Sequence, residues 1–270
     1  MIRKFLLVIA FCIASYANLN DVVSNMLGSA DYNTHKNLVN HIFANRTNFY
    51  KNNQVDYVAV SQELENNNLI KLNYGTVQDV EVTFNFSGSP KKSIKNINDI
   101  LRTFTFFTYI TKEEAVINDQ VKLVVKLKTA AAISPLKLSQ ELQSADCRVV
   151  DIKREGDYKW SYTIDATNAS VYRAEDLISS NQASLRKPTS KPYFVKVANA
   201  SKVTISSSAG NSWTPVVVFY DNDLNIIGMV EEDSLRSSLK LDVPNNTRFI
   251  KIDDSYSLAN IKRGFNITKE

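Results

Sequence analysis

The sequence has few of the residues from which metal sites are built. Its 270 residues include two histidines, His35 and His41, and two cysteines. The histidines are six positions apart, which places their side chains about 120° from each other around a helix. No CxxC or HExxH motif is present. The sequence therefore predicts no metal and no cofactor.

Motifs for nucleophilic and acid–base catalysis are also missing. There is no GxSxG motif, and neither histidine lies near a Ser or Cys motif. The adjacent carboxylates of Glu113-Glu114, Glu231-Glu232 and Asp253-Asp254 are neighbours in predicted turns, whereas a glycosidase needs two carboxyl groups facing one cleft. We predict that the protein is not an enzyme.

An excess of one charge is lacking too. Lys and Arg total 32, Asp and Glu total 28, and the formal net charge is +4. Nucleic-acid binding depends on a pronounced basic surface, so we predict no nucleic-acid partner.

Long hydrophobic runs are absent beyond the N-terminus. Arg3 and Lys4 precede an apolar run over 5–14, and the segment 15–17 places small residues where a signal peptidase recognises them. The run is shorter than the roughly twenty residues of a membrane span. We predict a signal peptide over 1–17 and a periplasmic protein that does not span a membrane. Cys12 leaves a lipoprotein anchor open, although Phe11 is bulky for the position before a lipidated cysteine.

Cleavage after Ala17 removes Cys12 and leaves Cys147 without a partner for an internal disulfide. A buried small residue at the start of a strand over 147–152 is the favoured interpretation. An intermolecular disulfide or a reactive thiol is the alternative.

What the sequence does contain is a repeat. SQEL occurs at 61–64 and again at 139–142, an offset of 78 residues. Around each copy a helical spacing gives way to period-two alternation, at 80–86 and at 158–164, with turns expected near Gly75 and at 155–157. We predict helix–strand–strand units over 56–87 and 134–166. The segments Ser61-Gln62-Glu63 and Ser139-Gln140-Glu141 are expected to face solvent.

A third unit is predicted over 93–128 by pattern alone. Ser93 is a candidate cap for a helix, strand material follows at 106–110, and a second strand alternates over 121–127 after a connection at 111–119. Together the units form a tandem α+β domain over 56–178, with a last helical stretch at 172–178.

Helical sequence precedes the units over 18–55. One helix is expected over 19–27, ending at Gly28, and a longer one starts at Asn33 or Thr34. Its apolar stripe either packs on the first unit or binds a partner, and packing is the simpler interpretation.

The polar, proline-containing stretch 179–192 is predicted to be a linker. Seven short strands separated by turn signals follow over 193–270, which predicts an all-β sandwich, jelly-roll-like in form. The predicted fold class is therefore α+β: N-terminal helices, tandem helix–strand–strand units, then the sandwich.

Three stretches are candidates for ligand binding. Asp221, Asp223, Asn225 and Glu232 have a calcium-loop spacing, but Ile226 occupies the glycine position, and a polar turn is the simpler interpretation. SGSPKKS over 87–93 is a candidate anion-binding loop, but an ordinary strand-to-helix turn is the simpler interpretation. Trp213 and Tyr220 are candidate aromatic contacts for a glycan, although packing is the favoured interpretation of Trp213.

The α+β units resemble small periplasmic domains of envelope secretion and assembly machines, and the whole chain resembles exported periplasmic proteins of AT-rich, polarly flagellated bacteria. The phrases VVVFYDNDLNIIG and VPNNTRFIKI are similar to those of β-sandwich modules that bind glycans or protein surfaces. These resemblances imply a non-enzymatic scaffold or adaptor whose partners are other envelope proteins, for example of the flagellar motor or a secretion machine. The alternative is a glycan- or ligand-binding protein acting through Trp213 and Tyr220.

Overall fold

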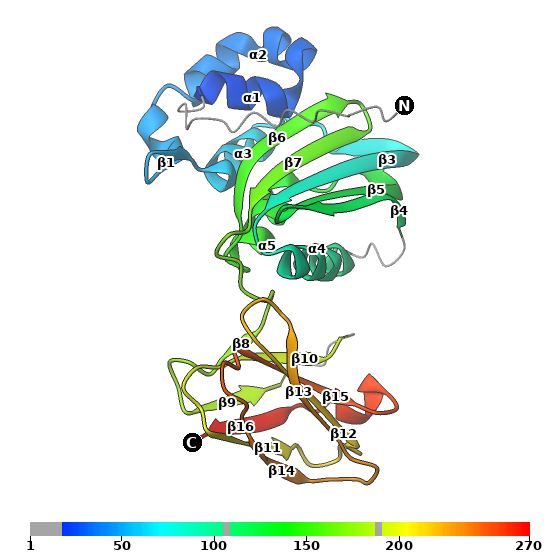
Figure 1. The fold of residues 1–270 in the computed structure, drawn as a ribbon. Helices are drawn as coiled ribbons and strands as arrows, with labels where there is room; N and C mark the ends of the chain where they lie inside the picture. Colours follow the sequence, from blue (N-terminus) through cyan, green and yellow to red (C-terminus); the bar gives the residue numbers. More distant parts are fainter. Residues whose placement is uncertain (1–17, 105–108, 187–190) are drawn as a thin grey trace, which may run out of the picture.

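The structure is a computed structural model that describes residues 18–104, 109–186 and 191–270 (Figure 1). The signal peptide predicted over 1–17 lies outside the described residues, as does the strand material predicted at 106–108. The described part is a mixed α+β protein with two separate hydrophobic cores, one in an N-terminal unit and one in a C-terminal unit.

The N-terminal unit contains every α-helix of the described residues and one five-stranded sheet. Its helices are α1 (Leu19–Leu27), α2 (Ser29–Ile42), α3 (Tyr57–Asn66), α4 (Pro90–Thr103) and α5 (Pro135–Gln143), with the short β1 (Tyr50–Lys51) and β2 (Gln54–Val55) hairpin before α3. The sheet consists of β3 (Asn73–Ser87), β4 (Ile110–Ile117), β5 (Gln120–Ala131), β6 (Arg148–Gly156) and β7 (Lys159–Asp165), in the order β4-β5-β3-β7-β6.

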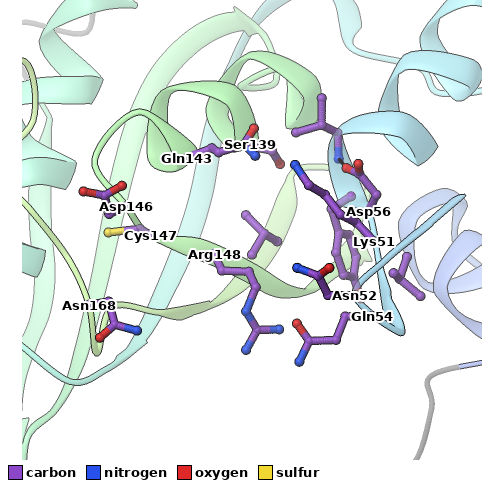
Figure 2. A pocket seen from close by; sticks show the side chains of 14 residues that line it. Lys51, Asn52, Gln54, Asp56, Ser139, Gln143, Asp146, Cys147, Arg148 and Asn168 are labelled. Carbon is purple, nitrogen blue, oxygen red and sulfur yellow. Dashed lines mark hydrogen bonds between the residues drawn. The ribbon is translucent and has the colours of Figure 1, made fainter.

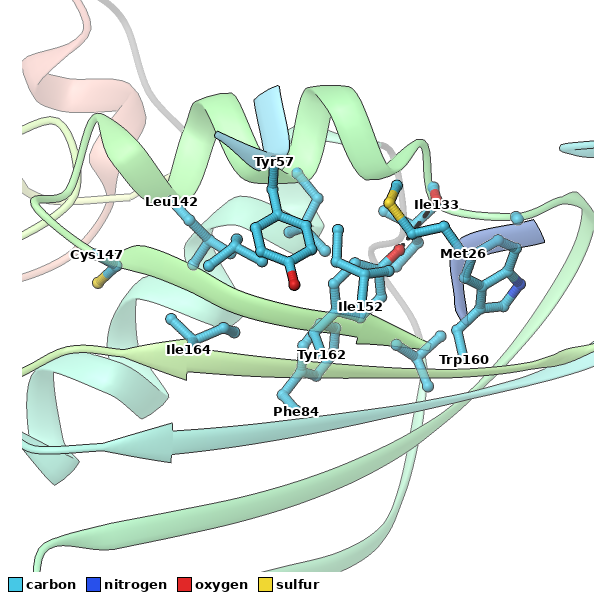
Figure 3. Close-up of a cluster of buried hydrophobic side chains, with 14 of the residues drawn as sticks. Met26, Tyr57, Phe84, Ile133, Leu142, Cys147, Ile152, Trp160, Tyr162 and Ile164 are labelled. Carbon is cyan, nitrogen blue, oxygen red and sulfur yellow. Dashed lines mark hydrogen bonds between the residues drawn. The ribbon is translucent and has the colours of Figure 1, made fainter. Parts of the chain in front are cut away.

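Residues 78 positions apart in the repeat pair with each other in the sheet. Strands β3 and β7 are parallel neighbours, and Val82 pairs with Trp160, Phe84 with Tyr162 and Phe86 with Ile164. Each partner is the repeat equivalent of the other. The two copies therefore lie side by side, and their alternating apolar side chains form one continuous inner face (Figure 3).

Helices α3 and α5 begin at the caps that the repeat indicates. The Asp56 carboxylate accepts hydrogen bonds from the amides of Val58 and Ala59, and the Ser134 hydroxyl accepts one from Lys137. Leu64 and Leu142 are fully buried against the same face of the sheet.

The structure differs from the prediction in the helix–strand–strand units over 56–87 and 93–128. No hairpin forms at Gly75: β3 is a single strand with an irregular register between Asn73 and Gln78, so the first unit has one strand where two were predicted. In the second unit, α4 begins at Pro90, before Ser93, and β4 occupies most of the segment predicted to be a connection. Gly75 has a φ of 75°, which absorbs the irregularity without ending the strand.

Of the two N-terminal helices, α1 has the predicted bounds and ends at Gly28, whereas α2 starts at Ser29, earlier than expected. Val22, Val23 and Met26 of α1 belong to the N-terminal core. The helix lies along β6, where the Arg154 guanidinium donates to the Leu27 carbonyl and forms an ion pair with Asp31. The apolar side of α1 packs on the repeat units. The stripe predicted in the longer helix joins the same core through Val39 and Phe43, although Leu38 is exposed.

The C-terminal unit consists of two sheets that share one core. One sheet has the order β13-β12-β15-β10-β8 and the other β14-β11-β16-β9. The strands are β8 (Glu175–Asp176), β9 (Gln182–Leu185), β10 (Tyr193–Lys196), β11 (Lys202–Ser207), β12 (Pro215–Tyr220), β13 (Ile226–Glu231), β14 (Ser238–Asp242), β15 (Phe249–Asp254) and β16 (Phe265–Lys269).

The segment predicted to be a linker over 179–192 contains a strand of this unit. Strand β9 pairs with β16, and Leu185 lies in the C-terminal core with 1% of its surface exposed. The helical stretch predicted over 172–178 is also wrong, because it holds a turn and β8, which pairs with β10. Polar composition misled the prediction, since a strand at the end of a sheet buries few side chains.

Contacts between the two units are mostly polar. Lys95 of α4 lies 4.2 Å above the Phe194 ring of β10, and Asp99 of α4 forms an ion pair with Lys191 at 3.0 Å. Lys91 donates to Asn225 at 2.5 Å, so the turn before β13 reaches the start of α4. In Figure 1 the C-terminal unit lies beneath α4 and α5.

Candidate functional site

A cavity of about 400 Å³ opens between the β1–β2 hairpin, the start of α3, α5 and the start of β6 (Figure 2). The hairpin forms because Asn52 and Asn53 both adopt positive φ, at 51° and 61°, as a tight two-residue turn requires. Cys147 and Arg148 bring the start of β6 to the opposite wall. The site is therefore built from segments more than 80 residues apart in the sequence.

The lining of this cavity is rich in carboxamides. Asn52, Gln54, Gln143 and Asn168 all line it, together with the cations Lys51 and Arg148. Arg148 is paired with Asp165 at 2.9 Å. Carboxamides both donate and accept hydrogen bonds, so the cavity suits a small, hydroxyl- or amide-rich ligand. None of these residues is predicted as a site from the sequence, although Asn52-Asn53 is a readable signal for a two-residue turn.

The thiol of Cys147 lies at the edge of the cavity and is shielded from solvent. Its side chain is 3% exposed, and burial raises the pKa of the thiol to about 11. The thiolate is the nucleophilic form. The structure therefore agrees with the packing interpretation of Cys147.

Trp213, predicted as a possible glycan contact, belongs to the C-terminal core. Its side chain is 1% exposed, its ring packs edge-on against Phe265 at 4.8 Å, and its indole N–H donates to the Asp253 carbonyl. It lines the floor of a hollow of about 400 Å³ whose other walls are mainly small polar residues at 207–212. A ring buried to this extent has no free face for a sugar to stack on, so the structure agrees with the packing interpretation of Trp213 and contradicts the glycan contact.

Tyr220 has a different position, on the outer face of the sheet. It is half-buried, pairs in register with Ile226 and Phe249, and stacks with Phe194 at 6.1 Å. Nearby Val218 pairs with Met229. We define the outer face by these side chains, which lie on the side of the sheet away from the C-terminal core: Phe194, Val218, Tyr220, Ile226, Met229 and Phe249.

Among the described residues, strand β13 forms the edge of this outer face. It hydrogen-bonds to β12 on one side and is the last strand of its sheet. Ile226 is 64% exposed and Met229 55%, with Ile227 also exposed between them. An exposed apolar edge strand is a template for pairing with another chain.

The two stretches considered as ion sites contact each other. Within the turn over 221–225, the Asp221 carboxylate accepts from the amides of Asp223 and Asn225, and Glu232 is paired with Arg236. Lys91, from the SGSPKKS segment, donates to Asn225, and burial lowers the pKa of neighbouring Lys92 while Asp223 opposes that shift. The turn over 221–225 therefore faces the lysines at the start of α4 across the two units.

Two features are absent from the described residues. No cluster of three or more His, Cys, Asp or Glu side chains there has the geometry of a metal site. No helix in the same residues has the length and apolar character to cross a membrane.

Comparison with known proteins identifies no family for this chain. No family model matches the chain, and no curated protein is similar to it. A solved structure, the secreted serine protease VesC from Vibrio cholerae, aligns with 10% sequence identity over 60% of this chain and 39% of the protease, with a TM-score of 0.20. A likeness at that TM-score carries no argument about fold or activity.

Proposed function

We propose that the protein is a non-enzymatic scaffold or adaptor of a cell-envelope assembly, exported to the periplasm, with other envelope proteins such as flagellar or secretion components as partners. The observation that carries the proposal is the exposed apolar edge of β13 on the outer face. Monomeric proteins rarely leave such an edge uncovered unless a partner binds there.

We also propose that the C-terminal unit is a jelly-roll-like β-sandwich. The strand order supports this: with β9 counted as the first strand and β16 as the eighth, the sheets have the orders 1-8-3-6 and 2-7-4-5, and β8 is an additional short strand beside β10. That is the order of an eight-stranded jelly roll. Such a unit is a rigid support for its edge strands.

The adaptor proposal is tested by site-specific photo-crosslinking in the envelope of producing cells. A crosslinker in place of Met229 is expected to capture a reproducible protein partner. The matched control is the same crosslinker in place of Ile117, an exposed residue of β4 at the edge of the other sheet. Capture at neither position, or equal capture at both, would count against the proposal.

A second candidate function is binding of a small polar ligand, such as a saccharide, in the cavity beside α5. The observation in its favour is the set of four carboxamides that line this cavity. Titration calorimetry with a panel of mono- and disaccharides is expected to show binding that Gln143→Ala weakens. Gln62→Ala, which removes an exposed amide of α3 outside the cavity lining, is the control. Heats of dilution alone across the panel would remove this candidate.

A further inference from the structure

We infer that β13 binds its partner by strand addition, and that the added segment is an extended strand with alternating apolar side chains and Lys or Arg at the end that lies beside Glu231 and Asp233. The inference rests on the adaptor function proposed above, because it names the partner chemistry of the same edge.

The backbone of β13 supplies the first argument. Strand β13 is at the end of the sheet order, so one of its edges has no neighbouring strand among the described residues. In an edge strand, alternate residues point their N–H and C=O groups away from the sheet. These groups pair with an incoming extended chain, and exposed side chains beside them set the specificity.

Side-chain composition distinguishes this edge from the corresponding one in the N-terminal unit. Strand β4 is also an edge, but Lys112, Glu113 and Glu114 occupy its middle, and Lys122 pairs with Glu113 at 2.8 Å. Charges in an edge strand oppose pairing with another chain. Strand β13 carries no charge from Ile226 to Val230. Pairing is therefore favoured at β13 and opposed at β4.

The charges that flank β13 define the partner. Glu231, Glu232 and Asp233 follow one another at its C-terminal end. Glu232 is paired with Arg236, whereas Glu231 and Asp233 are exposed and have no ion pair within the described part of the chain. At the other end, Asp221 and Asp223 lie near the lysines of α4. Uncompensated negative charge is thus concentrated at the C-terminal end, where basic side chains of an incoming strand are complementary.

On the outer face, the exposed side chains of the edge adjoin side chains of β12 that are buried or half-buried. Met229 lies beside Val218, and Ile226 lies beside Tyr220. An added strand that places apolar side chains on this side of the sheet extends the two cross-strand rows. Tyr220, an aromatic contact predicted from the sequence, would then border a protein ligand.

The test uses the full chain and a displayed library of random nine-residue peptides as the probe. Enriched peptides are expected to show apolar residues with a period of two and Lys or Arg at one end. Met229→Lys is expected to weaken binding of an enriched peptide by about tenfold or more. Glu231→Lys combined with Asp233→Lys is expected to shift the preferred end residues from basic to acidic. Ile117→Lys on β4 is the control and should leave binding unchanged.

Backbone pairing is tested separately by N-methylation of the enriched peptide. Methylating alternate amides in one register should abolish binding, and methylating the others should leave it within about twofold, because only one set faces β13. Binding that survives both patterns, enrichment of peptides with a helical period, or a library without enrichment would overturn strand addition. None of these results affects the crosslinking test, so failure of the inference and failure of the adaptor proposal remain distinguishable.

Discussion

At the scale of the residue, the two SQEL copies have the same burial pattern. Ser61 and Ser139 are buried, Gln62 and Gln140 are exposed, and Leu64 and Leu142 are fully buried. The expectation that both serines face solvent is therefore wrong. They lie on helices α3 and α5, which contact each other, and a small side chain permits close helix packing.

Neither hydroxyl has a hydrogen-bond partner among the described residues. Because an unsatisfied buried hydroxyl costs about 1–3 kcal/mol, Ser61→Ala and Ser139→Ala should leave the free energy of unfolding unchanged or raise it. Ser93→Ala is the matched control: that buried hydroxyl donates to the Gly88 carbonyl, and its loss should cost about 1 kcal/mol. Chemical denaturation measures all three, and a loss above that of Ser93→Ala at either SQEL serine would contradict the argument.

Asp254 is the best-connected carboxylate of the C-terminal unit. Its oxygens accept from the amides of Thr214, Tyr256 and Ser257 and from the Asn260 side chain. Burial alone would raise the pKa of Asp254, but the backbone hydrogen bonds outweigh it and the pKa is lowered. A carboxyl with a lowered folded pKa contributes stability above its unfolded pKa of about 3.9 and loses that contribution as the pH falls through the folded value.

Asp254→Asn should therefore lower the free energy of unfolding at pH 7 by about 2–3 kcal/mol. The difference from the parent protein should shrink as the pH falls below about 4. Denaturation at several pH values measures this, with Asp233→Asn, an exposed carboxylate outside any ion pair of the described residues, as the control. If the difference in the free energy of unfolding between Asp254→Asn and the parent protein stayed constant down to low pH, the lowered pKa of Asp254 would be contradicted.

At the scale of the element, β9 shows how an edge strand is missed. Only Leu185 of its four residues is buried, so its sequence has the polar composition of a linker. The strand is nonetheless held tightly, because a β-carbon built at Gly264 would lie 1.8 Å from the Leu185 carbonyl oxygen. Gly264 also has a φ of 86°.

Gly264→Ala should destabilise the C-terminal unit by at least about 3 kcal/mol, through both the backbone conformation and the clash. Gly75→Ala provides a matched control with a φ of 75° and no atom within 4 Å of the added carbon. It should cost only the conformational term of about 1–2 kcal/mol. Thermal unfolding compares the two, and equal losses would mean that β9 does not approach Gly264 closely.

At the scale of the whole molecule, two cores meet through few and mostly polar contacts. The apolar side chains of one core do not belong to the other, whereas the units contact each other through ion pairs and a cation–ring interaction. Separate cores with a polar contact unfold with limited mutual dependence.

Calorimetry should therefore resolve two unfolding transitions. Leu142→Ala should lower the free energy of unfolding of the N-terminal unit, and Ile252→Ala that of the C-terminal unit. Each loss should be about 2–5 kcal/mol, because the two side chains are fully buried in different cores. A single transition that both substitutions lower would show that the units unfold together.

The sequence by itself determined the local structure. Period-two alternation, the caps at Asp56 and Ser134, and turn residues fixed α3, α5 and most strands of the C-terminal unit, because these signals act within a few residues of the chain. The 78-residue offset gave the equivalence of two copies. It did not give their parallel pairing, the burial of Trp213, the place of β9 or the cavity beside α5. Those depend on contacts between residues distant in sequence, which tertiary packing alone decides.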